Sequence, residues 1–526
     1  MQKEQKTKSL EQWIWDAACA IRGSKDAGKF KDYILPLIFV KRLCDVFDDE
    51  LKTRIKAPTL SEGRKKAKLD NSRVRFYIPI SPKNPNDDTW SAIRSLSSNI
   101  GEELTRMIRE IASSNPRLDD VINRIDYNAT TRGEREIDDH RLSNLIEAIS
   151  QKRLGLHDVE PDIIGRAYEY LIRKFAENSG KSGGEFFTPP EVAEIMALIM
   201  NPEPGMAVYD PTCGSAGLLI KCESALNERM ASLGKKAFTP LSLYGQELEK
   251  DNWAMAKMNM IIHDMEGDIE LGDTFNNPKF SAQGGSASGG KDSSYHGIRK
   301  FDRAVANPMW NQPGFNEELY TDDPYHRFPA GNPGGKADWG WAQHIFSSLN
   351  DTGRAAIVLD TGAVSRGSGN ANTNKEKAVR QWFVDRDVVE GVLYLPENLF
   401  YNTTAPGIVM FLNKKKSAQL KDKIFLINAS HEFIKGDPKN YISEEQIKKI
   451  AETFNAKKVV ENFSLFIATA DVIKNDYNIS PSRYIHLGWV EEYKPVEDIL
   501  IELAEVETRA KEADKNLQKV LKELGF

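Results

Sequence analysis

The sequence has few cysteines, no long apolar run and no excess of positive charge. Four cysteines occur in 526 residues, and no two of them have the C-x-x-C spacing of metal or redox sites. This scarcity argues against zinc and against a disulfide framework, so we expect no metal site. No stretch approaches the roughly 18 apolar residues of a membrane span, and the first residues lack the apolar core of a signal peptide. We therefore predict a cytoplasmic chain that does not enter a membrane.

The formal net charge is -6, which is unusual for a protein that binds DNA tightly on its own. Any contact with nucleic acid would therefore use local patches or a partner. One basic cluster lies within residues 52–75, and two interpretations of it stay open: a patch that faces phosphates, or a solvated loop. The cluster comprises Lys52, Arg54, Lys56, Arg64, Lys65, Lys66, Lys68, Arg73 and Arg75.

The periodicity of apolar residues divides the chain, which is long enough for about three domains. Helical periodicity dominates residues 1–178 and predicts an all-α N-terminal domain. Between residues 179 and 415, strand and helix patterns alternate, which predicts a doubly wound, Rossmann-like α/β domain. Residues 416–488 are expected to form a C-terminal extension, although their pattern is mixed.

The last segment, residues 489–526, carries an apolar seam with 3-4 spacing over about four heptads. This pattern predicts a long helix that packs on another long helix, either of a partner or of the same chain. The seam consists of Val496, Ile499, Leu503, Val506, Ala510, Ala513, Leu517, Val520 and Leu524.

The stretch V-Y-D-P-T-C-G-S-A-G at residues 208–217 predicts a strand, a Gly-rich turn and the start of a helix. Glycines let the backbone approach a ligand, and a helix N-terminus offers free N–H groups. Ordinary strand–helix turns and dinucleotide sites share this pattern. However, an acid at the strand end would repel a diphosphate and suits the cationic end of S-adenosylmethionine. The candidate cofactor residues here are Asp210, Gly214, Ser215 and Gly217.

Three further segments would complete a cofactor site. L-S-L-Y-G-Q-E predicts a strand ending at Glu247, where α/β nucleotide sites hold ribose hydroxyls. I-E-L-G-D-T-F predicts a strand ending at Asp273, whose carboxylate can accept a hydrogen bond from an adenine amino group. Before the Gly-rich turn, Thr188 can cap a helix that begins with Pro189 and Pro190.

The strand F-D-R-A-V-A is expected to deliver N-P-M-W to the carboxyl edge of the sheet. The amino group of a base is a poor nucleophile, because its lone pair is delocalised into the ring. Two acceptors, the side-chain oxygen of Asn307 and the carbonyl of Pro308, can draw its hydrogens out of plane. Trp310 offers a face for stacking a base flipped out of duplex DNA. No Pro-Cys pair is present, which disfavours methylation at carbon 5 of cytosine.

The order of five motifs resembles the modification subunits of type I restriction–modification systems, in the gamma-ordered amino-methyltransferase class. These motifs are, in chain order, F-T-P-P-E-V, D-P-T-C-G-S-A-G, G-Q-E, G-D and N-P-M-W. The N-terminal helices, K-A-D-W (336–339) and D-Y-N-I-S-P-S-R-Y (476–484) extend the resemblance over nearly the whole chain. It implies methylation of adenine N6 in DNA from S-adenosylmethionine. It also implies two modification subunits per specificity subunit, which reads the target, and a restriction subunit that translocates DNA.

The resemblance implies cofactor contacts from Phe187 and Thr188 besides the residues above, and target-base contacts from Asn307, Pro308 and Trp310. The sequence departs from the family in two places. Met309 replaces the second proline of the usual catalytic motif, and Ala216 stands where glycine is common. Two alternatives stay open: an acceptor that is cytosine N4 or a protein glutamine, and a catalytically weak scaffold subunit.

Overall fold

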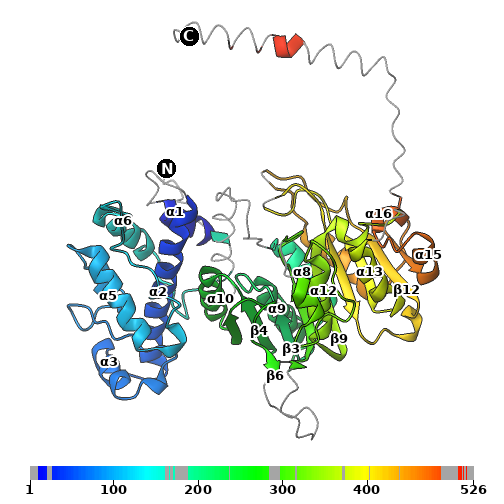
Figure 1. Ribbon diagram of the computed structural model, residues 1–526. Helices are drawn as coiled ribbons and strands as arrows, with labels where there is room; N and C mark the ends of the chain where they lie inside the picture. The colour runs from blue at the N-terminus through cyan, green and yellow to red at the C-terminus, as the bar shows by residue number, and fades with distance from the viewer. Residues whose placement is uncertain are drawn as a thin grey trace, which may run out of the picture. The chain divides into compact units, whose positions relative to one another are not determined.

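The computed structural model describes residues 10–19, 27–159, 165, 170–171, 188–235, 237–282, 297–313, 317–369, 374–401, 403–437, 439–486, 508–511, 513 and 517. The chain divides into two compact units, Met1–Ile485 and His486–Phe526. Figure 1 colours them from blue to red along the chain.

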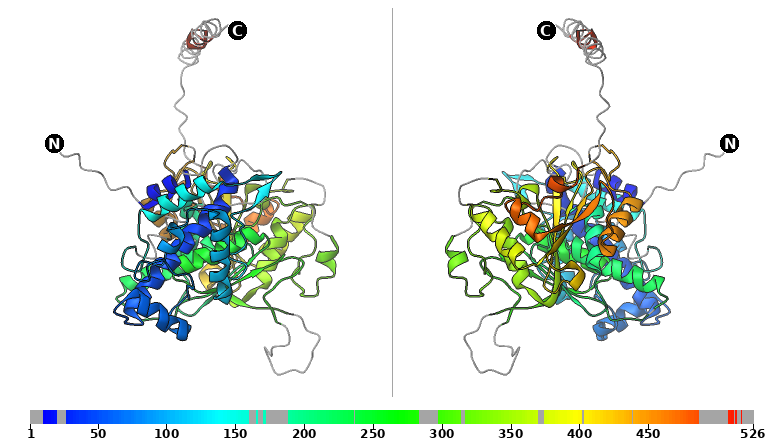
Figure 2. Two further views of the ribbon diagram at one scale, coloured as in Figure 1. Left: turned by 90° about the vertical axis from the view of Figure 1, so that its left-hand side faces the viewer. Right: turned by 90° about the vertical axis from the view of Figure 1, so that its right-hand side faces the viewer.

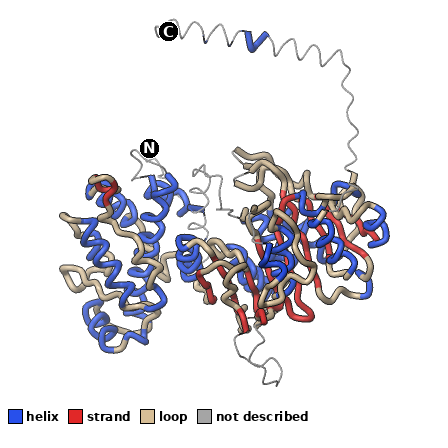
Figure 3. Tube along the Cα trace, in the orientation of Figure 1, coloured by secondary structure: helices blue, strands red, loops and turns tan. Residues whose placement is uncertain are grey.

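The first part of the larger unit is helical, as predicted, apart from one hairpin whose two strands have two residues each (Figure 3). In its fifth helix Leu104, Ile108 and Ile111 recur at helical spacing and are buried, so an amphipathic face builds the core. The elements are α1 (Leu10–Cys19), α2 (Ala27–Thr53), α3 (Leu60–Leu69), α4 (Ser91–Arg94), α5 (Ile100–Ser113), β1 (Thr130–Thr131), β2 (Glu134–Arg135) and α6 (Asp139–Ser150).

A nine-stranded sheet forms the second part, in the order β13-β12-β10-β11-β9-β8-β3-β4-β5. Neighbouring strands run parallel except at β11 and β13, which are antiparallel to their neighbours. Its strands are β3 (Ala207–Asp210), β4 (Ser242–Glu247), β5 (Gly267–Leu271), β8 (Phe301–Ala306), β9 (Leu349–Asp360), β10 (Val389–Tyr394), β11 (Gly407–Asn413), β12 (Lys423–Asn428) and β13 (Ser464–Ala468). A separate hairpin joins β6 (Ser281–Ala282) and β7 (Gly297–Ile298).

Helices cover both faces of this sheet (Figures 1 and 2). Successive residues of β9 point to opposite faces, as a pleated strand requires. Ala356 and Val358 join the core that includes α8, α9 and α14, whereas Ile357 and Leu359 join the core under α12 and α13. The helices are α8 (Pro190–Met200), α9 (Gly217–Ser232), α10 (Lys250–Ile262), α11 (Glu317–Thr321), α12 (Asp338–Ser347), α13 (Lys375–Asp385), α14 (Glu444–Ala456), α15 (Thr469–Lys474) and α16 (Pro481–Tyr484). The predicted order, a helical domain and then an α/β sheet, is confirmed.

The sheet does not end at residue 415, because β12 and β13 extend it by two strands. The domain boundaries at 178, 415 and 488 remain predictions. Of the heptad seam, Ala510, Ala513 and Leu517 lie among the described residues and are helical, and its other six members lie outside them. No helix among the described residues is both long and apolar enough to cross a bilayer.

The basic cluster at 52–75 includes helix α3, so it is not simply a solvated loop. Several of its cations are paired with acids. Arg64 is buried against Asp48, and Arg75 contacts both Glu50 and Asp264. These pairs reduce the positive charge that the cluster can offer to phosphates.

Candidate active site

The predicted site residues meet at the carboxyl edge of the sheet. Strands β5, β4, β3 and β8 run parallel side by side, so the residues that follow them gather at one edge. Asp210 ends β3 and Glu247 ends β4, as predicted. Asp273 lies two residues beyond the end of β5, and Asn307 directly follows β8.

Glu247 is bonded directly to the Gly-rich turn. Its Oε2 accepts a hydrogen bond of 2.9 Å from the Gly214 N–H, and its Oε1 accepts one of 2.9 Å from the Glu249 N–H. The side-chain N–H of Asn259, in α10, donates to the Ser215 carbonyl of the same turn at 3.0 Å. Asn259 could not be identified from the sequence, because it lies inside an apolar helix and contacts the turn only in the folded protein.

The Gly-rich turn is open on one side. Gly214 has φ +53°, and a Cβ added there would meet no atom within 4 Å. A Cβ added at Gly217 would meet only the Ser215 hydroxyl, at 3.9 Å. The turn therefore fits a group that approaches the backbone closely, above the N-terminus of α9.

Ala216 has φ +63° at the N-cap of α9, a left-handed conformation that glycine adopts more readily. We expect Ala216→Gly to lower the free energy of unfolding by less than an Ala→Gly change inside a helix, measured by chemical denaturation, because relief of the left-handed backbone (about 1 kcal/mol) offsets the loss of the buried Ala216 methyl group. The control is Ala225→Gly within α9, which should lower the free energy of unfolding by roughly 0.5–1 kcal/mol. A loss of stability in Ala216→Gly at least as large as in Ala225→Gly would contradict this relief of strain.

Asp210 is 1% exposed, and its Oδ1 accepts a hydrogen bond from the Thr212 N–H at 3.0 Å. Burial, aided by the charge of Glu247, raises its pKa to about 8. An acid whose pKa rises on folding takes up a proton, so its contribution to stability falls as pH rises from about 4 to 8. Burial also raises the pKa of Glu247. The two acids would ionise most readily beside a bound cation.

Asp273 shapes the turn that carries it. Its Oδ1 accepts a 2.8 Å hydrogen bond from the Phe275 N–H, and its Oδ2 accepts one of 2.6 Å from the Asn276 side chain. Beside this turn lies Arg327, which is fully buried and which sequence reasoning missed. Arg327 pairs with Asp323 and donates to the carbonyls of two residues of the turn, Thr274 and Phe275.

The network around Arg327 reaches the Gly-rich turn by one route and strand β3, which precedes the turn, by another. The Thr274 hydroxyl donates to the Pro211 carbonyl at 2.7 Å. On the other side Arg327 faces Nδ1 of His344, whose Nε2 lies 3.1 Å from the Tyr209 hydroxyl. Burial lowers the pKa of His344 well below its usual value, so the ring is neutral. Because arginine can only donate, Nδ1 accepts and Nε2 carries the proton.

Asn307 is held at both ends of its amide. Its Nδ2 donates to the Thr188 hydroxyl at 3.0 Å, and the Trp310 indole N–H donates to its Oδ1 at 3.2 Å. Thr188 was expected to cap α8, but the N-cap is Pro189, with no side-chain hydrogen bond. The Thr188 hydroxyl instead accepts from Asn307. Phe187 lies outside the described residues.

The predicted base-binding residues are packed into the protein. Pro308 is buried, and Trp310 is only 9% exposed, with its ring against Phe400 at a centroid distance of 4.7 Å. Little of the Trp310 ring faces solvent, so the surface that it offers to a stacked base is small. Stacking of a base on Trp310 remains a prediction. At the same edge Leu248, directly after Glu247, is 58% exposed. An exposed leucine here is a candidate surface for a flat apolar ring, and no motif in the sequence marks it.

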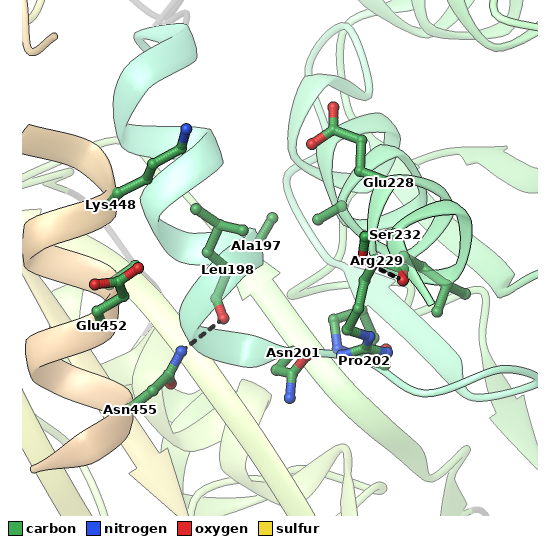
Figure 4. A pocket seen from close by; sticks show the side chains of 13 residues that line it. Ala197, Leu198, Asn201, Pro202, Glu228, Arg229, Ser232, Lys448, Glu452 and Asn455 are labelled. Atoms are coloured by element: carbon green, nitrogen blue, oxygen red, sulfur yellow. Dashed lines mark hydrogen bonds between the residues drawn. The ribbon is translucent and has the colours of Figure 1, made fainter. Parts of the chain in front are cut away.

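Burial raises the pKa of the Cys213 thiol well above its usual value, which does not suit a nucleophile. Among the described residues, no group of three or more His, Cys, Asp or Glu side chains is placed to hold a metal ion. A groove of about 430 Å³ lies between α8, α9 and α14 (Figure 4). None of the predicted site residues lines it, so it is separate from the candidate site.

The chain is similar to known proteins over most of its length. The model of the N-6 DNA Methylase family matches residues 159–492, and that of the HsdM N-terminal domain matches residues 10–149. The chain is 35% identical over 404 residues to the type I restriction enzyme MjaVIII methylase subunit of Methanocaldococcus jannaschii, covering 74% of this chain and 64% of that protein. It therefore spans just under two thirds of that relative's length.

Two other relatives are covered more fully. The MjaVII methylase subunit of the same organism is 31% identical, over 86% of this chain and 75% of that protein. The crystal structure of a type I restriction-modification methyltransferase subunit from Streptococcus thermophilus has a TM-score of 0.72 at 24% identity, covering 91% of this chain and 99% of that one. The structural likeness concerns the fold, and the sequence matches concern the family.

Proposed function

This chain belongs to the N-6 DNA methylase family, with the methylase subunits of type I restriction enzymes, and from that premise we propose how its residues transfer a methyl group from S-adenosylmethionine to adenine N6 in DNA. The resemblance seen in the sequence is thereby confirmed. Neither a cytosine or glutamine acceptor nor a scaffold role finds support in these relatives. The observation that carries the proposal is the meeting of Asp210, Glu247 and Asn307 at one sheet edge.

The cofactor would lie over the Gly-rich turn, and when bound it supplies an electrophilic methyl group on a sulfonium. Gly214, Ser215 and Gly217 leave room for its amino-acid end, and the Asp210 carboxylate balances its positive charge. Phe187 and Thr188 are proposed to lie against it from the preceding segment.

The adenosine end would lie toward β4 and β5. Each Glu247 oxygen accepts one backbone N–H and keeps a lone pair for a ribose hydroxyl. The exposed Leu248 would cover one face of the adenine ring, and Asp273 would accept from the ring's amino group.

The burial of Asp210 gives a direct test of cofactor binding. At pH 6 the cofactor's amino group is protonated, and so is Asp210, whose pKa is about 8. A cation placed beside Asp210 lowers that pKa, so binding should release about one proton at pH 6. Calorimetry of binding in two buffers of different ionisation enthalpy measures this release. Asp210→Asn should release none, and an equal release from the variant would contradict the assignment.

The target adenine would lie at residues 307–310. The Asn307 Oδ1 and the Pro308 carbonyl accept the two hydrogens of N6 and so restore the nucleophilicity of its lone pair. Because Trp310 Nε1 can only donate, the amide atom that faces it is the oxygen. That geometry supports the role of Asn307 as acceptor, with Thr188 holding the other end of the amide.

Type I methylase subunits assemble with specificity and restriction subunits on DNA. For this chain we propose two copies per specificity subunit, with the heptad seam of residues 489–526 as the docking helix. The native mass of the reconstituted complex measures the stoichiometry, and deletion of residues 489–526 should abolish assembly. A complex that forms without this segment would contradict the docking role.

The central experiment is transfer of labelled methyl groups to DNA by this chain with its specificity partner. Digestion of the product to nucleosides should place the label on N6-methyladenine. Label on cytosine, or wild-type protein that binds S-adenosylmethionine but labels no DNA, would overturn the proposed function.

A further inference from the structure

The segment Asn307–Asn311, here called the target-base loop, lacks the second proline that the family places at position 309. Each proline fixes one φ angle, so Met309 leaves the loop with one rigid residue fewer. Misplacing reacting groups by about 1 Å can cost about 100-fold in rate. The acceptors of this loop therefore need support from elsewhere in the fold.

The structure provides that support at the last residue of the loop. Asn311 has φ +55°, a left-handed conformation that asparagine tolerates better than most residues. Its N–H donates to Asp338 Oδ1 at 3.0 Å. Its side-chain Oδ1 accepts from two cations, Lys336 Nζ at 2.7 Å and Arg366 Nη1 at 2.9 Å. Both the backbone and the side chain of Asn311 are thus held.

Arg366 is the hub of this cluster. Its guanidinium also binds Asp338, Asp360 and Glu376, and its side chain is 20% exposed while that of Asp338 is fully buried. Arg366 therefore binds three carboxylates, and it shares the amide oxygen of Asn311 with Lys336. Such charge-assisted bonds are short and directional, so they can fix a loop where backbone restraint is missing.

The segment that carries Arg366 is itself anchored. Arg380, which is fully buried, donates to the carbonyls of Ala363, Arg366 and Tyr477. The D-Y-N segment at 476–478 and α13 therefore hold the backbone of residues 361–369. Because this segment is held in place, the hydrogen bond from Arg366 can fix the position of Asn311 and of the loop that contains it.

We propose that Arg366, acting through Asn311, is a positioning residue that fixes the target-base loop in place of the absent second proline. This inference rests on the proposed function. Arg366 is not among the residues proposed to contact the cofactor or the base, and it would act by keeping the Asn307 oxygen and the Pro308 carbonyl at the spacing that the amino group requires.

Asn311→Gly separates this role from a general contribution to stability. Glycine keeps the left-handed backbone and removes only the shared acceptor, so Arg366 retains its three carboxylates. In the complex with the specificity partner, we expect the single-turnover rate of labelled methyl transfer to fall about 100-fold. The Kd for S-adenosylmethionine should stay within about twofold, since the cofactor residues are unchanged. Asn311→Asp keeps the acceptor and the backbone conformation and should stay within about threefold of the wild-type rate.

The decisive measurement adds Met309→Pro to each background. Among the hydrogen bonds of the described residues none uses the Met309 N–H, so its loss breaks no contact. Met309→Pro should restore the rate of Asn311→Gly by about tenfold and change the wild-type rate by less than about threefold. Arg366→Lys, which keeps the charge but not the fork, provides a second background if Asn311→Gly does not fold.

A wild-type rate in Asn311→Gly, or equal effects of Met309→Pro in both backgrounds, would overturn the inference. The proposed function fails separately, if the wild-type complex labels no DNA.

Discussion

Asn307→Ala is expected to lower methyl transfer to DNA by about 100- to 1,000-fold while leaving S-adenosylmethionine binding intact. The substitution removes the acceptor that Trp310 orients and the amide that Thr188 holds. Neither contact involves the Gly-rich turn, so Asp210, Gly214 and Glu247 keep their geometry. Single-turnover labelling measures the first effect, and calorimetry of cofactor binding measures the second.

Two variants make this result specific. Asn307→Asp keeps an acceptor oxygen and should retain more activity than alanine, because a carboxylate can still accept from the amino group of the base. Asn455→Ala, on α14 beside the separate groove, removes an asparagine whose side chain bonds the Leu198 carbonyl, and it should leave transfer unchanged. Wild-type transfer by Asn307→Ala would exclude Asn307 as the base acceptor.

Arg327→Met is expected to lower the free energy of unfolding by about 3–5 kcal/mol. Asp323 would be left as a buried charge without its partner, and the carbonyls of Thr274 and Phe275 would lose their donors. Since this turn also holds Asp273 and bonds Pro211, cofactor affinity should fall as well. Chemical denaturation gives the first quantity and calorimetry the second.

The matched control is Arg106→Met, which removes an arginine from an exposed ion pair with Glu103. There water replaces the lost partner, so the change should stay within about 0.5 kcal/mol. If Arg327→Met cost no more than Arg106→Met, the buried pair would not stabilise the cofactor turns.

Much of the site could be predicted because its signals are local. The strands that end at Asp210, Glu247 and Ala306 are short segments that contain apolar residues and are followed by turn residues, and this length and these flanking residues favour a strand over a helix. The glycines of the turn at 208–217 mark positions that need a close or left-handed backbone. The order of these motifs along the chain was enough to indicate the family.

Other features could not be predicted from the sequence, because the residues that contact each other are far apart along the chain. The mixed pattern after residue 414 concealed β12 and β13, which join the sheet only by pairing with β10 and with each other. Thr188 looks like a helix cap from its neighbours alone, yet its hydroxyl is taken by Asn307, 119 residues away.

By itself the sequence determined the ends of β3, β4 and β8, the Gly-rich turn and the residue types of the catalytic loop, since propensity and hydrogen bonding within a few residues specify them. Only the tertiary structure decided which contacts hold these parts in their relative positions. Arg327 and Arg366 read as ordinary surface charges in the sequence. Packing alone brings Arg327 onto the Asp273 turn and Arg366 onto Asn311, 55 residues away, where burial makes their ion pairs and hydrogen bonds directional.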